Sequence, residues 1–168
     1  RKVRDFLNIY RDRVEDPVRM IEDNKLECVL SNGSRIVSLP AKEQTIRGFS
    51  SVSLLVEDEA SRVEDEVYYA IRPMLAVSGG RLILLSTPWG KRGHFFSEWN
   101  NPEFEKYHVP ARECPRIGAD FLAQERRDLG DYWYRQEYLC EFLDLVGSVF
   151  TYEEIQGAIN PELEMMDL

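Results

Sequence analysis

SLLVEDEAS, residues 53–61, is the stretch that decides the fold of this chain, and RLILLSTP, residues 81–88, follows the same plan. Each is a short apolar run that ends in polar side chains. Apolar runs of this length are typical of strands that are buried on both faces of a parallel sheet. In open α/β sheets, ligands bind beyond the carboxyl ends of such strands. The two runs therefore predict two parallel strands with a ligand site where they end.

The polar residues at these ends predict the chemistry of the site. Asp58 and Glu59 follow the first run, and Ser86 and Thr87 follow the second. An acid that binds Mg²⁺, a second acid that orients water and a hydroxyl that senses a phosphate are the parts of a magnesium–nucleotide site. Taken singly, the acid pair is also typical of a surface loop, and Thr87-Pro88 of a turn. Their occurrence together at this separation favours the nucleotide site.

Glu57 does not fit a strand that is buried on both faces. Alternation along the strand places Glu57 on the face opposite Asp58. A buried acid is costly unless it is paired. We therefore expect the strand to open to solvent at Glu57, as it would beside a site at the strand end.

Composition limits the classes of protein. The chain has 168 residues, a hydrophobic fraction of 43% and a net charge of −9, which predicts one soluble domain with a core of its own. No apolar run reaches the ~20 residues of a membrane span, and no signal peptide is visible. Three widely spaced cysteines indicate a reducing compartment. The negative net charge argues against a broad DNA-binding surface, which would need a basic patch. Local contacts with DNA stay open at Lys91, Arg92, Arg116, Arg126 and Arg127.

The other elements follow from periodicity and turn signals. Asn32-Gly33 between two β-rich runs predicts a hairpin, and Pro73 should kink or shorten the helix that contains it. Asp120, Asp131 and Thr151 are predicted helix caps. We expect helices over residues 1–14, 63–76, 94–99, 120–130, 131–142 and 152–159, and strands over 25–30, 35–39, 52–56, 81–85, 104–109 and 147–150.

One part of a nucleotide site is missing from the sequence. A P-loop reads G-x-x-x-x-G-K-[ST], and its amides and lysine bind the phosphates. Only Gly90-Lys91 approaches this pattern, and Arg92 follows where Ser or Thr should stand. Arg47 is a candidate phosphate contact, although Arg47-Gly48 is also typical of a turn. No segment fits the P-loop pattern, so we expect the main phosphate-binding element to lie outside this chain. The chain also starts without Met, so we expect residue 1 to continue from a segment that is not included.

Four blocks of sequence occur in a distinctive order: IRG at 46–48, LLVEDEA at 54–60, GRLILLSTPWG at 80–90 and YRQEYLCEF at 134–142. Together they resemble the ATPase domain of the large terminase subunit of tailed bacteriophages and prophages. The resemblance covers most of residues 29–150, and the order and spacing of the blocks make it specific.

This resemblance implies an α/β fold, the parallel-sheet core of an ASCE-type P-loop NTPase, incomplete here without its Walker A strand, loop and helix. It implies Asp58 as the Walker B ligand of Mg²⁺, Glu59 as the catalytic carboxylate, and Ser86 and Thr87 as the coupling motif. It implies an enzyme that hydrolyses ATP and moves double-stranded viral DNA into a procapsid in the cytoplasm of the bacterial host. The implied partners are that DNA, the portal protein and the small terminase subunit.

The resemblance also implies a Walker A segment before Arg1 and a nuclease related to ribonuclease H after Leu168. We therefore expect residues 1–150 to form part of the ATPase domain and residues 151–168 to begin a linker. Without the Walker A strand, an exposed sheet edge should favour rearrangement, strand exchange or a homo-oligomer. For the same reason we expect this chain alone to hydrolyse little or no ATP.

Two other classes of protein stay open at this point. A helicase-type P-loop ATPase also carries acid pairs and Ser-Thr-Pro at its strand ends. A catalytically dead prophage remnant that only binds partners would also lack the P-loop. ATP-driven unwinding without packaging would favour the first class, and a gene that begins near Arg1 would favour the second.

Overall fold

The computed structural model describes residues 2–11, 13–15, 17–40 and 48–159. Contacts within the chain divide it into two compact units, Arg1–Arg47 and Gly48–Leu168. Each unit has a sheet of its own. The acid pair and the hydroxyl pair both belong to the second unit, which therefore contains the candidate site.

The first unit combines a helix with a three-stranded antiparallel sheet. Helix α1 spans Lys2–Arg11, within the predicted range, and the hairpin at Asn32-Gly33 is confirmed. Gly33 has a positive φ of 82°, which glycine adopts without strain. The sheet order is β1 (Met20–Asp23), β2 (Glu27–Leu30) and β3 (Arg35–Val37). Strand β1 is an addition that the sequence pattern did not indicate.

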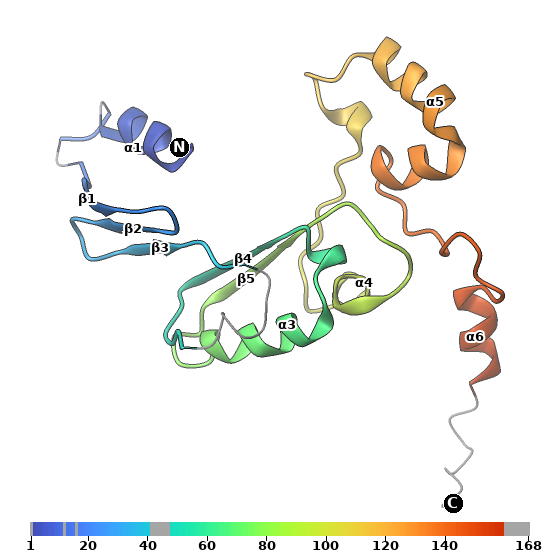
Figure 1. The fold of residues 1–168 in the computed structure, drawn as a ribbon, viewed down its shortest axis with the longest axis horizontal. Coiled ribbons are helices and arrows are strands. Elements are labelled where there is room, and N and C mark those ends of the chain that lie inside the picture. The colour runs from blue at the N-terminus through green and yellow to red at the C-terminus, as the bar shows by residue number, and fades with distance from the viewer. Residues whose placement is uncertain (1, 12, 16, 41–47, 160–168) are drawn as a thin grey trace, which may run out of the picture. The chain divides into compact units, whose positions relative to one another are not determined.

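The second unit is built around two parallel strands joined by a helical crossover (Figure 1). Strand β4 spans Leu54–Asp58 and strand β5 spans Arg81–Leu85, as the two apolar runs predict. Pro73, which has no amide proton for a helical bond, ends the crossover helix early. The other elements are η1 (Ala60–Arg62), α3 (Asp65–Ile71), η2 (Arg72–Leu75), α4 (Gly93–Asn100), η3 (Ala111–Glu113), α5 (Ala119–Glu137) and α6 (Tyr152–Ala158).

Gly80 lets the chain return close to the start of β4. A Cβ atom on Gly80 would lie 2.0 Å from the carbonyl oxygen of Val52, so no side chain fits at this position. The Gly80 amide donates to the carbonyl oxygen of Leu75 at 3.3 Å, and the Arg81 amide donates to that of Ser53 at 3.0 Å. Close backbone approach therefore sets the start of β5 beside β4.

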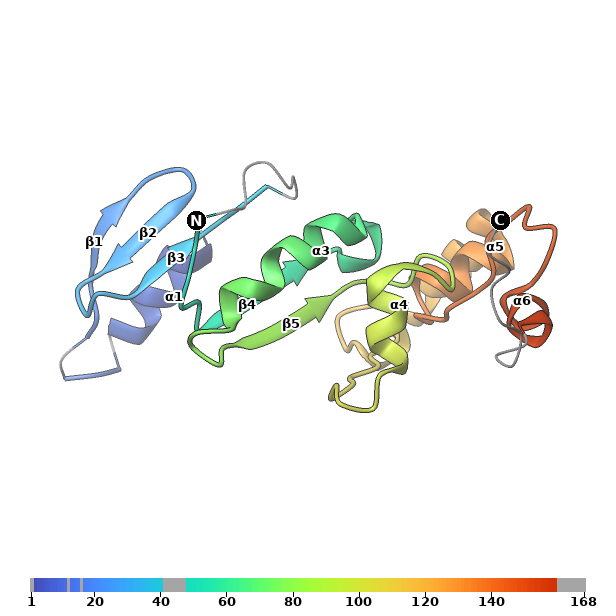
Figure 2. The same cartoon turned by 90° about the horizontal axis from the view of Figure 1, so that it is seen from below.

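Helices cover one face of the β4–β5 pair, and α3 runs along it in both views (Figures 1 and 2). The buried residues beside this face include Val67, Tyr68, Ile71 and Met74. The opposite face carries Leu54, Val56, Ile83 and Leu85, which are 42–52% exposed. The expectation of burial on both faces is therefore wrong for the part of the chain that the structure describes.

Helix α5 breaks at Gly130, as predicted, where φ is 79° and ψ is 166°. Its N-cap is Gly118, so Asp120 lies in the first turn and does not cap the helix. The helix ends at Glu137, earlier than the predicted end at residue 142. In α6 the Thr151 hydroxyl accepts the Glu154 amide, which confirms the predicted cap.

The predicted strands over 104–109 and 147–150 do not form; both segments are loops and turns. Backbone groups outside helices and sheets need other partners. The first segment is held against the end of α5, because the His108 ring bonds to the carbonyl oxygen of Leu139 at 2.9 Å. The Ala111 amide likewise donates to the carbonyl oxygen of Tyr138 at 2.8 Å.

Candidate active site

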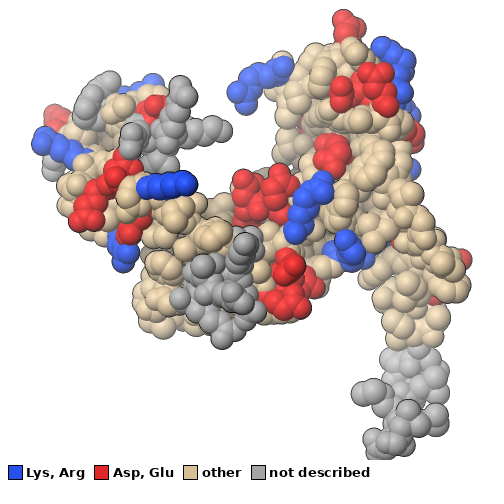
Figure 3. All heavy atoms as spheres, in the orientation of Figure 1, with Lys and Arg blue, Asp and Glu red and all other residues tan. Residues whose placement is uncertain are grey.

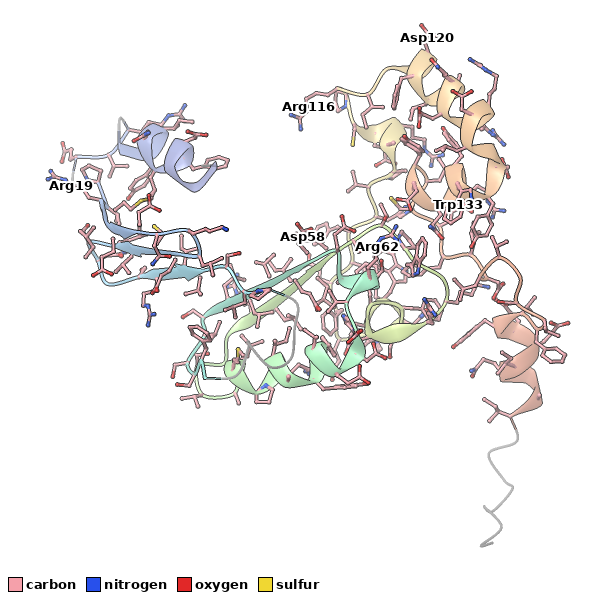
Figure 4. The ribbon with its side chains drawn as sticks, viewed as in Figure 1. Arg19, Asp58, Arg62, Arg116, Asp120 and Trp133 are labelled. Carbon is pink, nitrogen blue, oxygen red and sulfur yellow. The ribbon has the colours of Figure 1, made fainter. Side chains whose placement is uncertain are left out.

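The ends of β4 and β5 lie side by side, as neighbouring parallel strands require. The register pairs Asp58 with Leu85, so the acid pair and the hydroxyl pair leave the sheet at the same edge. The Ser61 amide donates to Ser86 Oγ at 3.2 Å across this edge. Figure 4 shows Asp58 and Arg62 at this end of the strand pair. The predicted convergence of the two strand ends is confirmed.

Ser61 bonds the two strand ends together. Its hydroxyl oxygen lies 2.8 Å from Ser86 Oγ and 2.8 Å from the carbonyl oxygen of Thr87. A carbonyl can only accept, so Ser61 donates its single hydroxyl proton to Thr87, and Ser86 must donate to Ser61. The proton of Ser86 is thus used inside the protein. A phosphate contact in which Ser86 donates would require this bond to break.

Asp58 and Glu59 are exposed carboxylates at a sharp turn. Glu59 has a left-handed backbone, with φ 56° and ψ 35°, a conformation that is uncommon outside glycine and concentrates at functional sites. Asp58 Oδ1 accepts the Glu59 amide at 3.1 Å. Within the described ranges no basic side chain pairs with Asp58.

The groups at this turn that could bind a metal are two exposed carboxylates. The described residues contain no group of three or more His, Cys, Asp or Glu side chains that could hold a metal ion. Mg²⁺ is bound through one or two carboxylates together with water and phosphate oxygens, without an all-protein cage. The exposed carboxylates of Asp58 and Glu59 therefore suit Mg²⁺ that arrives with a nucleotide.

Thr87 is bonded to an acid at the end of α5. Its hydroxyl donates to Glu137 Oε2 at 3.1 Å, and Glu137 Oε1 accepts from Arg62 Nη2 at 3.1 Å. The Arg62 guanidinium lies over the Trp89 ring, 4.0 Å from its centroid. Arg62 Nε also lies 3.8 Å from Glu59 Oε2. A chain of polar contacts thus runs from Glu59 through Arg62 and Glu137 to Thr87.

Glu57 is buried, and the expectation that the strand opens to solvent there is wrong. Glu57 is 7% exposed, and its Oε2 lies 3.2 Å from Nε2 of His94, which is 4% exposed. This is an ion-pair separation, although the N–H is not aligned on the oxygen as a hydrogen bond. His94 Nδ1 lies 2.9 Å from Asp65 Oδ1, which also accepts the His94 amide at 2.7 Å. Pairing with His94 takes the place of hydration.

Two carboxylates favour the charged form of His94. Burial alone lowers the pKa of a histidine, but Glu57 and Asp65 outweigh burial and raise the pKa of His94 above its ordinary value of 6.5. Tyr68 stacks on the imidazole with ring centroids 4.3 Å apart. The His94 imidazole thus connects the end of β4 with the starts of α3 and α4.

Two basic residues from the sequence analysis have different outcomes. Arg47, the candidate phosphate contact, lies outside the described residues. Lys91, named above as a possible DNA contact, pairs with Asp144 at 3.2 Å and with Glu153. The segment after α5 returns to the loop after β5, and this packing surrounds the lysine.

Four residues of the site were not predicted: Ser61, Arg62, His94 and Glu137. Ser61 and Arg62 follow the acid pair almost directly, and this position was the available signal. Glu137 lies in one of the four recurring blocks, where the sequence suggested no role for it. His94 had no signal at all, because the histidine and its two acids come from three separate elements.

Two further findings concern the distribution of charge on the surface and the hydropathy of the helices. On the face drawn in Figure 3, Lys and Arg side chains lie scattered among Asp and Glu side chains. None of the helices that the structure describes is long and apolar enough to cross a membrane.

Solved structures define the class of the fold. The ATPase domain of the large terminase of Thermus phage P74-26 has a TM-score of 0.65 at 20% identity, covering 84% of this chain and 69% of that one. A mutant form of that domain has a TM-score of 0.59 at 20% identity, covering 77% and 57%. With its parallel strands and helical crossover, the chain has the α/β fold of a P-loop NTPase.

Sequence comparison defines the family within this class. The chain belongs to the family described as "Terminase large subunit, T4likevirus-type, N-terminal", whose model matches residues 5–157. The terminase large subunit of Escherichia phage T5 is 26% identical over 134 residues, covering 74% of this chain and 30% of the relative. That of Thermus phage G20c is 26% identical over 129 residues, covering 66% and 26%. The chain thus spans less than a third of the length of either relative. Of the two classes of ATPase left open by the sequence, family membership favours the terminase over the helicase.

Proposed function

We propose that this chain is part of the ATP-hydrolysing motor of a phage terminase large subunit, which moves viral DNA into a procapsid. The observation that carries the proposal is the shared edge of β4 and β5, where Asp58 and Glu59 meet Ser86 and Thr87. Family membership supports the same assignment. An acid that can bind Mg²⁺, beside a residue that can orient the attacking water, is part of what phosphoryl transfer uses.

Each residue at the edge has a proposed role. Asp58 holds the Mg²⁺ of MgATP, and Glu59 orients the attacking water and accepts its proton. Bound Mg²⁺ would neutralise charge on the phosphates. Arg47 is proposed as a further phosphate contact. The Glu59 side chain is 65% exposed, so a water molecule can reach its carboxylate.

The hydroxyl pair couples the site to the rest of the unit. Ser86 is bonded to Ser61, and Thr87 to Glu137 at the end of α5. If the Thr87 hydroxyl changes its hydrogen-bond partner, the end of α5 therefore loses its bond to the strand end. This is the proposed route from hydrolysis to movement.

The partners follow from the proposed motor. They are double-stranded viral DNA, the portal protein, the small terminase subunit and further copies of the chain, in the cytoplasm of the bacterial host. The scattered basic residues support DNA contact at a few points, as part of an assembly, more than across one broad surface.

ATP turnover by the intact large subunit tests the proposal. Glu59→Gln should lower the turnover number by about a hundredfold or more, because a general base is lost. Glu66→Gln, an exposed acid on α3, is the matched control and should leave turnover unchanged. Turnover by Glu59→Gln at the unaltered rate would refute the proposed role. An intact protein that hydrolyses no ATP would support the remnant that only binds partners.

A further inference from the structure

Glu137 occupies the position of an anion between Thr87 and Arg62. One carboxylate oxygen accepts from the Thr87 hydroxyl and the other from the Arg62 guanidinium, both at 3.1 Å. The Trp89 ring supports the guanidinium from one side, 4.0 Å from the ring centroid. A hydroxyl and an arginine are donors that also bind phosphate oxygens. The carboxylate thus fills a small anion site whose donors come from the edge of the sheet.

We propose that Thr87 and Arg62 form a phosphate-binding pair, at which the carboxylate of Glu137 and the terminal phosphate of ATP compete. This inference rests on the proposed function, since it requires ATP at the edge of β4 and β5. It assigns Arg62 as a binding residue and Glu137 as a positioning residue.

Binding of Glu137 and binding of a phosphate exclude each other at Thr87. Thr87 has one hydroxyl proton, so it cannot donate to Glu137 and to a phosphate at the same time. Arg62 already lies near two carboxylates, with Nε 3.8 Å from Glu59 and Nη2 3.1 Å from Glu137. A phosphate that binds Arg62 and Thr87 places negative charge beside Glu137 and repels it. The exchange therefore has two distinct end states.

Release of Glu137 changes the end of α5. Glu137 is the last residue of the helix, and its neighbour Gln136 is 1% exposed and donates to Glu137 Oε1 at 3.1 Å. When Glu137 is released, the buried amide of Gln136 loses this acceptor and has to find another partner. The carboxylate exchange thus transmits occupancy of the phosphate position to α5.

The test measures nucleotide binding by the intact large subunit with a non-hydrolysable ATP analogue and Mg²⁺. Glu137→Gln keeps the shape of the side chain and removes the competing charge. It should tighten binding of the analogue about threefold to tenfold, because the competent state is no longer blocked. Binding of ADP should not change, since ADP lacks the terminal phosphate. Arg62→Gln should weaken binding of the analogue.

A second arginine–glutamate pair supplies the matched controls. Arg135 Nη2 lies 2.6 Å from Glu141 Oε2, and these side chains are 44% and 37% exposed, against 40% and 31% for Arg62 and Glu137. Glu141→Gln and Arg135→Gln should leave binding of the analogue unchanged.

Tighter binding is the result that a merely structural role of Glu137 would not produce. Unchanged or weaker binding of the analogue by Glu137→Gln would overturn the inference. The inference would also be overturned if Glu137→Gln bound ADP equally more tightly, or if only inorganic phosphate or DNA bound more tightly. Each of these results would mean that a group other than the terminal phosphate of ATP competes with Glu137.

Fluorine NMR of Trp89 in fluorotryptophan-labelled protein decides the question even where Glu137→Gln does not fold. Trp89→Phe identifies the resonance, which should shift with the analogue and not with ADP, because the anion bound to the guanidinium on the ring changes. No shift would overturn the inference. If Glu59→Gln abolishes turnover while these measurements fail, the proposed function stands and only this inference falls; absence of turnover in the unaltered protein overturns both.

Discussion

Nε2 of His94 lies 3.2 Å from Oε2 of Glu57, in the interior directly behind the acid pair of β4. Both side chains are buried. Glu57 belongs to the strand and His94 to α4, so the pair connects the sheet edge to the helix that follows β5. Removing either charge leaves the other without compensation in the interior.

His94→Phe should lower the free energy of unfolding by about 3 kcal/mol, because it leaves the buried carboxylate of Glu57 without a positively charged partner. The new ring can still stack on Tyr68. Urea denaturation of the intact protein measures this change. The control is the double variant Glu57→Leu with His94→Phe, which should recover most of the loss. A double variant that is less stable than His94→Phe would contradict the pairing.

Stability should fall as the pH rises above 6.5, the ordinary pKa of histidine. His94 titrates near 6.5 in the unfolded chain and at a higher pKa in the folded protein, between the carboxylates of Glu57 and Asp65. Its contribution is complete below 6.5 and is lost as the pH rises through the folded pKa. Denaturation curves across this range should show the decline, and His94→Phe should remove that part of it. The same decline in His94→Phe would assign it to other groups.

Ser61→Ala should destabilise the edge of the sheet by about 1–2 kcal/mol. The change removes the donor to the Thr87 carbonyl oxygen and the acceptor of the Ser86 proton. Thermal unfolding checks the value. Ser97→Ala, an exposed position on α4, is the control and should stay within about 0.5 kcal/mol of the unaltered protein. Equal effects of the two changes would argue against the Ser61 bonds.

Gly80→Ala should destabilise the protein by about 3 kcal/mol or more, because the new methyl group would lie 2.0 Å from the Val52 carbonyl oxygen. The measurement is again urea denaturation. At Gly157, inside α6, a Cβ meets nothing within 4 Å, so Gly157→Ala should be neutral or slightly stabilising. A harmless Gly80→Ala would mean that β4 and the start of β5 are not so close.

Local sequence signals predicted the elements that depend on neighbouring residues. The hairpin at Asn32-Gly33, the early end of the crossover helix at Pro73, the break at Gly130 and the cap at Thr151 all formed as expected. Each depends on the conformational range or hydrogen bonding of one residue and its close neighbours. The strand predicted over 104–109 failed because a strand also needs a partner, which no local pattern supplies.

The sequence by itself determined the parallel strand pair and the convergence of Asp58 and Glu59 with Ser86 and Thr87, since parallel neighbours must end at one edge. Only the tertiary structure decided that His94 pairs with Glu57 and that Glu137 accepts from Thr87. The physical reason is that a buried charge or a hydroxyl is satisfied by whichever side chain the packing brings within about 3 Å, and these partners come from helices far along the chain.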